Sequence, residues 1–188
     1  MLRTNQSFLT YIEQLYKQQD SGAEIGVKSF SAGQRLLNQG EQSYHIMLIR
    51  EGVAKCFFTE ENDKEYILEF LGSGEIIGEI EAIRNIPCLC NVEAITDVSV
   101  YSFQKEIFYR LLQKDIRLNN LLIEAFAERI INTSSRASFQ QLYTIEHSLS
   151  KLLELQSKQN LSLSKEDMAS YLGITLRSLN RALENLKR

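Results

Sequence analysis

Eight of the nine glycines of this chain fall between Gly22 and Phe103, and the 69 residues that follow contain none. Within the glycine-rich part, short runs of β-branched and aromatic residues alternate with turn residues, at intervals of about ten residues. Such spacing is typical of a compact antiparallel barrel or roll. The runs that we expect to form strands are 44–49, 52–58, 65–71, 90–96 and 98–103.

Residues 104–172 favour helices instead. Apolar residues three and four positions apart predict one helix within 104–115 and another over 145–156. The same spacing predicts a short amphipathic helix over 7–19, before the glycine-rich part. A polar connector, 157–160, precedes the closing segment.

A longer helix is predicted from Ile116 to residues 140–144. Apolar residues recur seven positions apart along it, with a second set interleaved three positions later. This heptad spacing is typical of a helix that pairs with a partner helix, so we expect a homodimer. The same stripe also suits packing on the roll, and a helix of this length has faces for both. The expected dimer face contains Ile116, Ile123, Phe126, Ile130 and Ala137.

The closing stretch, Leu161–Arg188, has the pattern of two short helices around a single glycine. Ser164 can cap the first helix, and Gly173 supplies the left-handed residue that ends it. Thr175 can cap the second helix. The apolar residues of both helices fall on one face, which is typical of a helix-turn-helix. The second helix of such a motif presents its first turns to the major groove of DNA.

The polar face of this second helix carries side chains suited to DNA. Arginine can donate two hydrogen bonds to guanine, and asparagine can pair with adenine. We therefore expect Arg177, Asn180 and Arg181 to read base edges. Hydroxyl and ammonium groups suit phosphate oxygens. The expected backbone contacts are Thr175, Ser178, Lys165 and Lys187.

The net charge of −3 is unevenly distributed along the chain. Residues 158–188 carry six Lys or Arg and three acids, a balance of +3, which leaves −6 for residues 1–157. Salt screens the fields of exposed charges beyond roughly 10 Å, so the local balance decides a phosphate contact. A basic tip on an acidic body is compatible with DNA binding.

Several classes of protein are disfavoured. No apolar run reaches the length of a membrane span, and polar residues interrupt the N-terminal segment where a signal peptide needs an apolar core, so we expect a cytoplasmic protein without membrane contact. Neither paired carboxylates nor a nucleophile–base set nor a phosphate loop is present, so we expect no enzyme. The chain has three cysteines and two histidines. We expect them to be packing or surface residues that hold no metal or cofactor: Cys56, Cys88, Cys90, His45 and His147.

Three segments in order carry a resemblance to a known family. They are "FSAGQRLLNQGEQSYHIMLIREGVAKCFF" (Phe30–Phe58), "GSGEIIGEIEAI" (Gly72–Ile83) and "VEAITDVSVYSF" (Val92–Phe103). With the long helix and the helix-turn-helix behind them, the chain resembles the cyclic-AMP receptor protein and fumarate–nitrate regulator (Crp/Fnr) family of bacterial transcription factors. The resemblance covers about Val27 to Arg188.

The resemblance implies an α+β fold: an N-terminal antiparallel β-roll like the cyclic-nucleotide-binding jelly roll, a long dimerisation helix and a C-terminal helix-turn-helix of the winged type. It also implies a dimer that binds a roughly palindromic operator in double-stranded DNA, with RNA polymerase as a candidate further partner. Family members continue past the second helix into a β-hairpin wing, and this sequence stops at Arg188 without one. A protein that ended there would lack the wing's phosphate contacts and bind DNA weakly.

The effector pocket departs from the pattern of cyclic-AMP binders. Gly78 and Glu79 match the residues that hold the ribose, but Cys88 and Leu89 stand where an Arg-Ser pair holds the cyclic phosphate. Without that charge a phosphate would be poorly stabilised, so we expect no response to cyclic AMP and a structural role for Glu79. On the long helix, the positions that correspond to nucleotide contacts are Thr133 and Ser134.

Other sensors of the family also fit poorly. The iron–sulfur type needs four cysteines, mostly N-terminal, and residues 1–55 contain none. For a haem type, His45 in a predicted strand is the candidate axial ligand. Cys88 and Cys90 would form a thiol sensor if they were exposed and acidic, although cysteines in a roll are more often buried. A small organic ligand, a peptide or no effector remain open.

We expect three units: an N-terminal helix and effector-sensing roll (1–103), a helical linker with the dimerisation helix (104–141), and a helix-turn-helix DNA-binding domain (142–188). The expected function is that of a dimeric, sequence-specific transcriptional regulator. The alternative is a ligand-sensing roll whose helical tail binds a protein instead of DNA. That alternative gains support if the basic face of the second helix is buried in the dimer.

Overall fold

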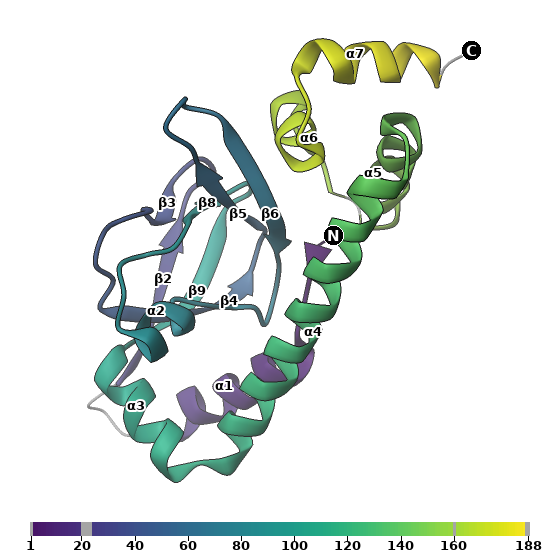
Figure 1. Ribbon diagram of the computed structural model, residues 1–188. Coiled ribbons are helices and arrows are strands. Elements are labelled where there is room, and N and C mark those ends of the chain that lie inside the picture. Colours follow the sequence, from purple (N-terminus) through teal and green to yellow (C-terminus); the bar gives the residue numbers. More distant parts are fainter. Residues whose placement is uncertain (1, 20–23, 160, 187–188) are drawn as a thin grey trace.

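The protein is described here by a computed structural model that covers residues 2–19, 24–159 and 161–186 (Figure 1). The strands are β1 (Leu2–Arg3), β2 (Ile25–Phe30), β3 (Arg35–Leu37), β4 (His45–Glu51), β5 (Ala54–Thr59), β6 (Glu65–Leu71), β7 (Ile76–Ile77), β8 (Asn91–Ala94) and β9 (Val98–Gln104). The helices are α1 (Gln6–Gln18), α2 (Glu79–Arg84), α3 (Lys105–Lys114), α4 (Ile116–Leu142), α5 (Ile145–Gln159), α6 (Lys165–Leu172) and α7 (Leu176–Asn185).

The strands form two sheets that face one another as a roll. One has the order β1-β6-β5-β8-β3 and the other the order β2-β9-β4-β7. Neighbouring strands are antiparallel except for β1 and β6. The prediction of a mixed fold built on an antiparallel roll is confirmed. The core between the sheets includes Met47, Ile49, Cys56, Leu71, Val92, Val98 and Val100.

Successive side chains of a strand point to opposite faces of the sheet, so the outer face of the four-stranded sheet carries a second core. In β9, Val100 points between the sheets, whereas Tyr101 and Phe103 belong to the cluster under the helices. Helices α1, α3 and α4 cover this face (Figure 1). Their contribution to the cluster includes Phe8, Ile12, Phe108, Leu118 and Leu122.

A third core joins the closing helices to the roll. Phe57, Ile67 and Phe70 of the five-stranded sheet share one buried cluster with residues of α5, α6 and α7. Figure 1 shows α6 and α7 beside the β5–β6 edge of the roll. The helical residues at the centre of this cluster are Leu149, Leu152, Met168, Ala169, Leu179 and Ala182.

The predicted helices are confirmed with small shifts at their ends. The long helix runs from Ile116 to Leu142, and α5 begins at Ile145. The long helix therefore ends where we expected. The strands β1, β2, β3 and β7 and the short helix α2 were not predicted, because two to six residues show too little periodicity and because β2 is interrupted by Gly26. The division into three domains stays a prediction. None of the helices in the described part combines the length and apolar character that crossing a bilayer requires.

Close packing at Gly74 gives a test of the N-terminal segment. Gly74 has φ 84°, and a Cβ there would lie 1.8 Å from the carbonyl oxygen of Asn5. Gly33 has the same φ of 84°, but a Cβ there would meet nothing within 4 Å. We expect Gly33→Ala to lower the free energy of unfolding by about 1–2 kcal/mol through strain alone. Gly74→Ala should lower it by about 2–4 kcal/mol, because the clash adds to the strain. Urea titrations of both variants would show this difference, and equal losses would contradict it.

Candidate nucleic-acid interface and effector pocket

The helix-turn-helix is built by three local devices that the sequence predicted. The Ser164 hydroxyl accepts the backbone N–H of Asp167 at 2.9 Å and caps α6. Gly173, with φ 68°, ends α6 in the left-handed conformation. The Thr175 hydroxyl then accepts the N–H of Ser178 at 3.2 Å and caps α7. The three caps fix where each helix begins and how the chain turns between them.

The two faces of α7 differ sharply. Leu179 and Ala182 are buried against α5 and α6. Arg177, Asn180 and Arg181 are exposed on the opposite face, in the first two turns of the helix. The three expected base-reading side chains are therefore brought together on one open surface.

The expected phosphate-contacting residues are placed less uniformly. Thr175 and Lys165 are exposed, whereas Ser178 is half-buried. The Lys165 ammonium donates to the side-chain oxygen of Asn180 at 3.0 Å, which links α6 to the exposed face of α7. Lys187 lies outside the described residues.

Polar contacts fix α6 on the roll. Lys55 of β5 forms ion pairs with Asp167 at 2.7 Å and with Glu93 at 3.2 Å. Burial opposes the charge on Lys55, but these two carboxylates raise the pKa of Lys55 above its ordinary value. The ammonium therefore stays charged at neutral pH and ties the first turn of α6 to two strands.

Arg136 of α4 makes a second connection, which the sequence analysis missed. Its guanidinium donates to the carbonyl oxygens of Leu68 and Tyr171, the first on β6 and the second on α6. It also lies 4.0 Å from the centre of the Tyr171 ring. One side chain of the long helix thus contacts the roll and the helix-turn-helix together.

The predicted effector pocket holds a buried ionic network. Glu79, at the start of α2, is 1% exposed, and its carboxylate accepts hydrogen bonds from Arg129 of α4. Arg129 also donates to the carbonyl oxygen of Ile76 at 2.9 Å and lies 3.6 Å from the Glu75 carboxylate. Arg3 of β1 pairs with Glu75 at 2.6 Å and with Glu69 at the same distance.

Burial dominates the acid–base behaviour of this network. It raises the pKa of Glu75 and of Glu79, and the neighbouring arginines offset only part of that effect. Burial also opposes the charge on Arg129, yet the adjacent carboxylates raise the pKa of Arg129 above its usual range. The guanidinium is therefore a permanent cation that balances the acids around it.

The other expected pocket residues do not all meet at Glu79. Gly78 precedes it with φ 89°, and a Cβ there would lie 2.9 Å from the carbonyl oxygen of His45. Cys88 is buried and Leu89 is 47% exposed. The two α4 hydroxyls that the resemblance assigned to the pocket, Thr133 and Ser134, are exposed.

The cysteines have the character of buried packing residues. Cys56, Cys88 and Cys90 are each less than 10% exposed, and the sulfurs of Cys56 and Cys90 lie 2.8 Å apart. The Cys90 sulfur and burial raise the pKa of Cys56, and burial raises the pKa of Cys88 to about 11. Reactive thiols have lowered pKa values and open access, so this environment disfavours a thiol sensor. Within residues 2–19, 24–159 and 161–186, no cluster of His, Cys, Asp or Glu suits a metal ion.

The long helix presents two faces. Ile116, Ile123 and Ile130 are each more than 60% exposed, and Ala137 continues their line. Phe126, which we expected in the same dimer face, is half-buried against the helix-covered core of the roll. Its ring lies beneath the Arg129 guanidinium, so it belongs to the inner face. The outer face is a narrow line of isoleucines.

The sequence and fold are similar to those of known regulators. Residues 27–115 match the cyclic nucleotide-binding domain family. The chain is 22% identical over 176 residues to the transcriptional activator protein FnrL of Cereibacter sphaeroides, covering 86% of this chain and 70% of that protein. It is 25% identical over 167 residues to the anaerobic regulatory protein of Haemophilus influenzae, covering 83% and 65%. The c-di-GMP-responsive global regulator CLP of Xanthomonas campestris superposes with a TM-score of 0.81 at 17% identity, covering 95% of this chain and 91% of that chain.

In sequence and fold the chain is similar to regulators of the Crp/Fnr family. Roll, long helix and closing helices follow in the Crp/Fnr order, as the resemblance implied. The chain spans about two thirds of the length of the two curated relatives. The contact between Glu79 and Arg129 could not be predicted from the sequence, because an arginine on a helix carries no signal of burial.

The ionic network around Arg129 predicts a large effect on stability that a second substitution can reverse. Arg129→Met should lower the free energy of unfolding by about 3–5 kcal/mol, because it leaves buried carboxylates without their cation. Adding Glu79→Gln in the same chain should recover most of that loss, since it removes the charge that had been left unpaired. The measurement is urea unfolding at neutral pH. Arg117→Met, at an exposed position of the same helix, is the control and should change the value by less than about 0.5 kcal/mol. An Arg129→Met loss no larger than the control's would show that the pair contributes nothing.

Proposed function

We propose that the protein is a dimeric, sequence-specific DNA-binding transcriptional regulator of the Crp/Fnr type. The observation that carries the proposal is the open face of α7, where Arg177, Asn180 and Arg181 stand together at the start of the second helix of a capped helix-turn-helix. The named relatives are transcription regulators, which supports the same function. DNA binding also places the protein in the cytoplasm.

The dimer brings two such faces to one operator. The line of Ile116, Ile123 and Ile130 on α4 exposes apolar side chains that a second copy can cover. A two-fold pair of helix-turn-helix units addresses half-sites about 34 Å apart, one turn of DNA. The operator is therefore roughly palindromic.

The exposure of each side chain of the helix-turn-helix indicates its expected contact with DNA. Arg177, Asn180 and Arg181 read base edges in the major groove. Thr175 and Lys165 hold the phosphate backbone, with Ser178 at the margin of the same surface, and Lys187 stays an expected phosphate contact from the sequence. The contact from Lys165 to Asn180 holds the asparagine amide in a fixed orientation before DNA arrives.

The protein does not require cyclic AMP. Arg129 already neutralises Glu79, and the cation that would hold a cyclic phosphate is replaced by Cys88 and Leu89. A nucleotide at this place would displace Arg129 and bring its own anion beside buried carboxylates. The alternative, in which the helical tail binds a protein, would be favoured if the dimer buried the basic face of α7; in the single chain that face is exposed.

The decisive test of DNA binding is selection from a random pool of duplexes followed by gel-shift titration of the selected operator. Arg181→Ala should lower operator affinity by about 1–3 kcal/mol while leaving binding to random DNA nearly unchanged, because a base contact carries sequence information. Arg50→Ala, an exposed arginine on β4, serves as the control and should bind as the parent does. Equal operator affinities for Arg181→Ala and the parent would refute the assigned role, and failure to select any sequence would refute the function.

The dimer face gives an independent prediction. Ile123→Lys should convert the dimer into a folded monomer, because the side chain is exposed in the single chain and a charge on each copy would face its twin. Sedimentation equilibrium gives the mass, and the thermal midpoint reports on the fold. Glu124→Lys, at the exposed neighbouring position, makes a change of charge off the line of isoleucines and should remain dimeric. If Ile123→Lys kept the dimer mass, the isoleucine line would not be the interface.

A further inference from the structure

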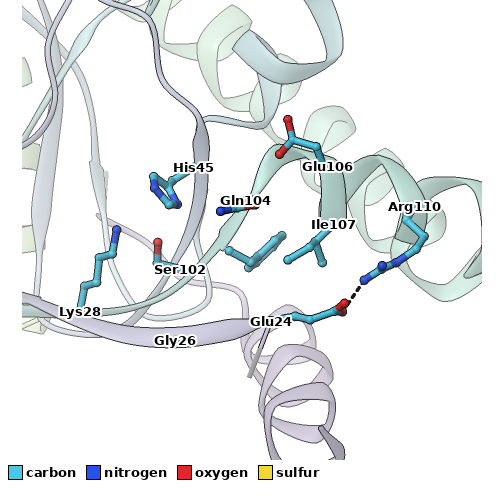
Figure 2. A pocket seen from close by; sticks show the side chains of 10 residues that line it. Glu24, Gly26, Lys28, His45, Ser102, Gln104, Glu106, Ile107 and Arg110 are labelled. Atoms are coloured by element: carbon cyan, nitrogen blue, oxygen red, sulfur yellow. Dashed lines mark hydrogen bonds and ion pairs between the residues drawn. The ribbon is translucent and has the colours of Figure 1, made fainter. Parts of the chain in front are cut away.

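A pocket of about 550 Å³ lies at the α3 end of the roll, between β2, the end of β9, the start of β4 and α3 (Figure 2). None of its lining residues belongs to the Glu79 network or to the helix-turn-helix. Strand register explains how it forms. Gly26 is paired with Ser102, and His45 is paired with Gln104, so these residues share one face of the four-stranded sheet.

The floor of the pocket contains hydrogen-bonding groups without partners. Ser102 is 4% exposed, and its buried hydroxyl makes no hydrogen bond within the described residues. The buried Nδ1 of His45 is likewise unpartnered there. Figure 2 shows the Ser102 hydroxyl between the Lys28 ammonium and the His45 ring, with the Gln104 amide next to them. Buried polar groups normally have partners, so this end of the pocket is arranged for a ligand that accepts hydrogen bonds.

The pocket is open because Gly26 has no side chain. A Cβ at Gly26 would meet only the carbonyl oxygen of Ser102, at 4.0 Å, and the backbone there is not in the left-handed region. Any residue could therefore occupy this position of β2 without strain, and a large one would fill the pocket. Glycine at this position leaves the pocket open.

The charges around the pocket define the ligand. Burial and the nearby Lys28 ammonium lower the pKa of His45, which is therefore neutral at neutral pH. Lys28 and Arg110 supply two positive charges, and Glu24 and Glu106 supply two negative charges, with Arg110 already paired to Glu24. A ligand with one negative charge can use Lys28, whereas a dianion would meet the two acids at the rim.

We propose that this pocket binds a small organic monocarboxylate. The carboxylate accepts hydrogen bonds from Lys28, Ser102 and Gln104, with the neutral His45 imidazole beside it. The half-buried Ile107 side chain of α3 covers the apolar part of the ligand (Figure 2). The proposal is independent of DNA binding, and it assigns a site whose lining residues are separate from the Glu79 network.

The test follows the amide signals of the ¹⁵N-labelled full chain by NMR during titration with 3-methylbutanoate. The amides of Gly26, Ser102 and Gln104 should shift in a saturable manner. The uncharged isostere 3-methylbutanamide should bind at least about tenfold more weakly, because it lacks the charge that Lys28 recognises. Inorganic phosphate should leave these signals in place. The absence of a saturable shift with 3-methylbutanoate, or equal binding of the amide, would overturn the proposal.

Three variants separate binding from folding. Gly26→Leu fills the pocket, and Lys28→Gln removes its cation. Each substitution should lower the affinity for 3-methylbutanoate about tenfold or more. Ser102→Ala should weaken binding while keeping or raising the thermal midpoint, since it removes a hydroxyl that has no partner in the empty pocket. A fall in the midpoint with unchanged binding would assign Ser102 to the fold alone. Lys17→Gln on α1 is the matched control and should titrate like the parent, and a loss of affinity in that variant equal to that in Lys28→Gln would overturn the assignment of the cation.

Discussion

The placement of the long helix depends on a cation that is buried with its counter-ions. Arg129 reaches from α4 into the roll, where Glu79 and Glu75 receive it, and Arg3 completes the balance from the N-terminal strand. Removing charges from water costs several kcal/mol for each ion, and the cost is recovered only where every charge keeps its partners. The N-terminal strand, the start of α2 and the middle of α4 are therefore bound to one another, and none can move without exposing or separating charges. This requirement also fixes which face of α4 is turned outward.

Two arginines of α4 contact different parts of the protein. Arg129 contacts the effector region, and Arg136, seven residues later, contacts β6 and the end of α6. Seven residues are two turns of helix, so both side chains lie on one face about 10 Å apart along the axis. The exposed isoleucines occupy another face of the same helix. One helix therefore carries the contacts to the effector region, the contacts to the helix-turn-helix and the line of exposed isoleucines.

Features determined by local chemistry could be predicted from the sequence, and features determined by long-range contacts could not. Ser164, Gly173 and Thr175 specify caps and a turn through their own side chains or backbone freedom, so the helix-turn-helix followed from three residues. By contrast, the roles of Arg129 and Arg136 depend on Glu79 and Leu68, which lie 50 and 68 positions away along the chain. The heptad pattern placed Phe126 with the isoleucines, because spacing alone cannot tell which face of a helix meets the core. Thr133 and Ser134 came from the resemblance and are exposed, whereas the residue of α4 that contacts Glu79 is Arg129.

The charge balance of the effector region also restricts where this protein can sense anything. In a pocket that binds an anion, the protein supplies the cation and the ligand supplies the negative charge; here Arg129 and Glu79 supply both from within the chain. An entering anion would find no free cation and would separate an existing pair. The pocket between β2, β9, β4 and α3 has the opposite character, with an unpartnered hydroxyl beside an exposed ammonium. Its strand β9 passes directly into α3 and then α4, so an occupant there contacts the chain immediately before the helix that carries both arginines. Binding in this pocket would leave the pair between Arg129 and Glu79 intact, because neither residue lines it.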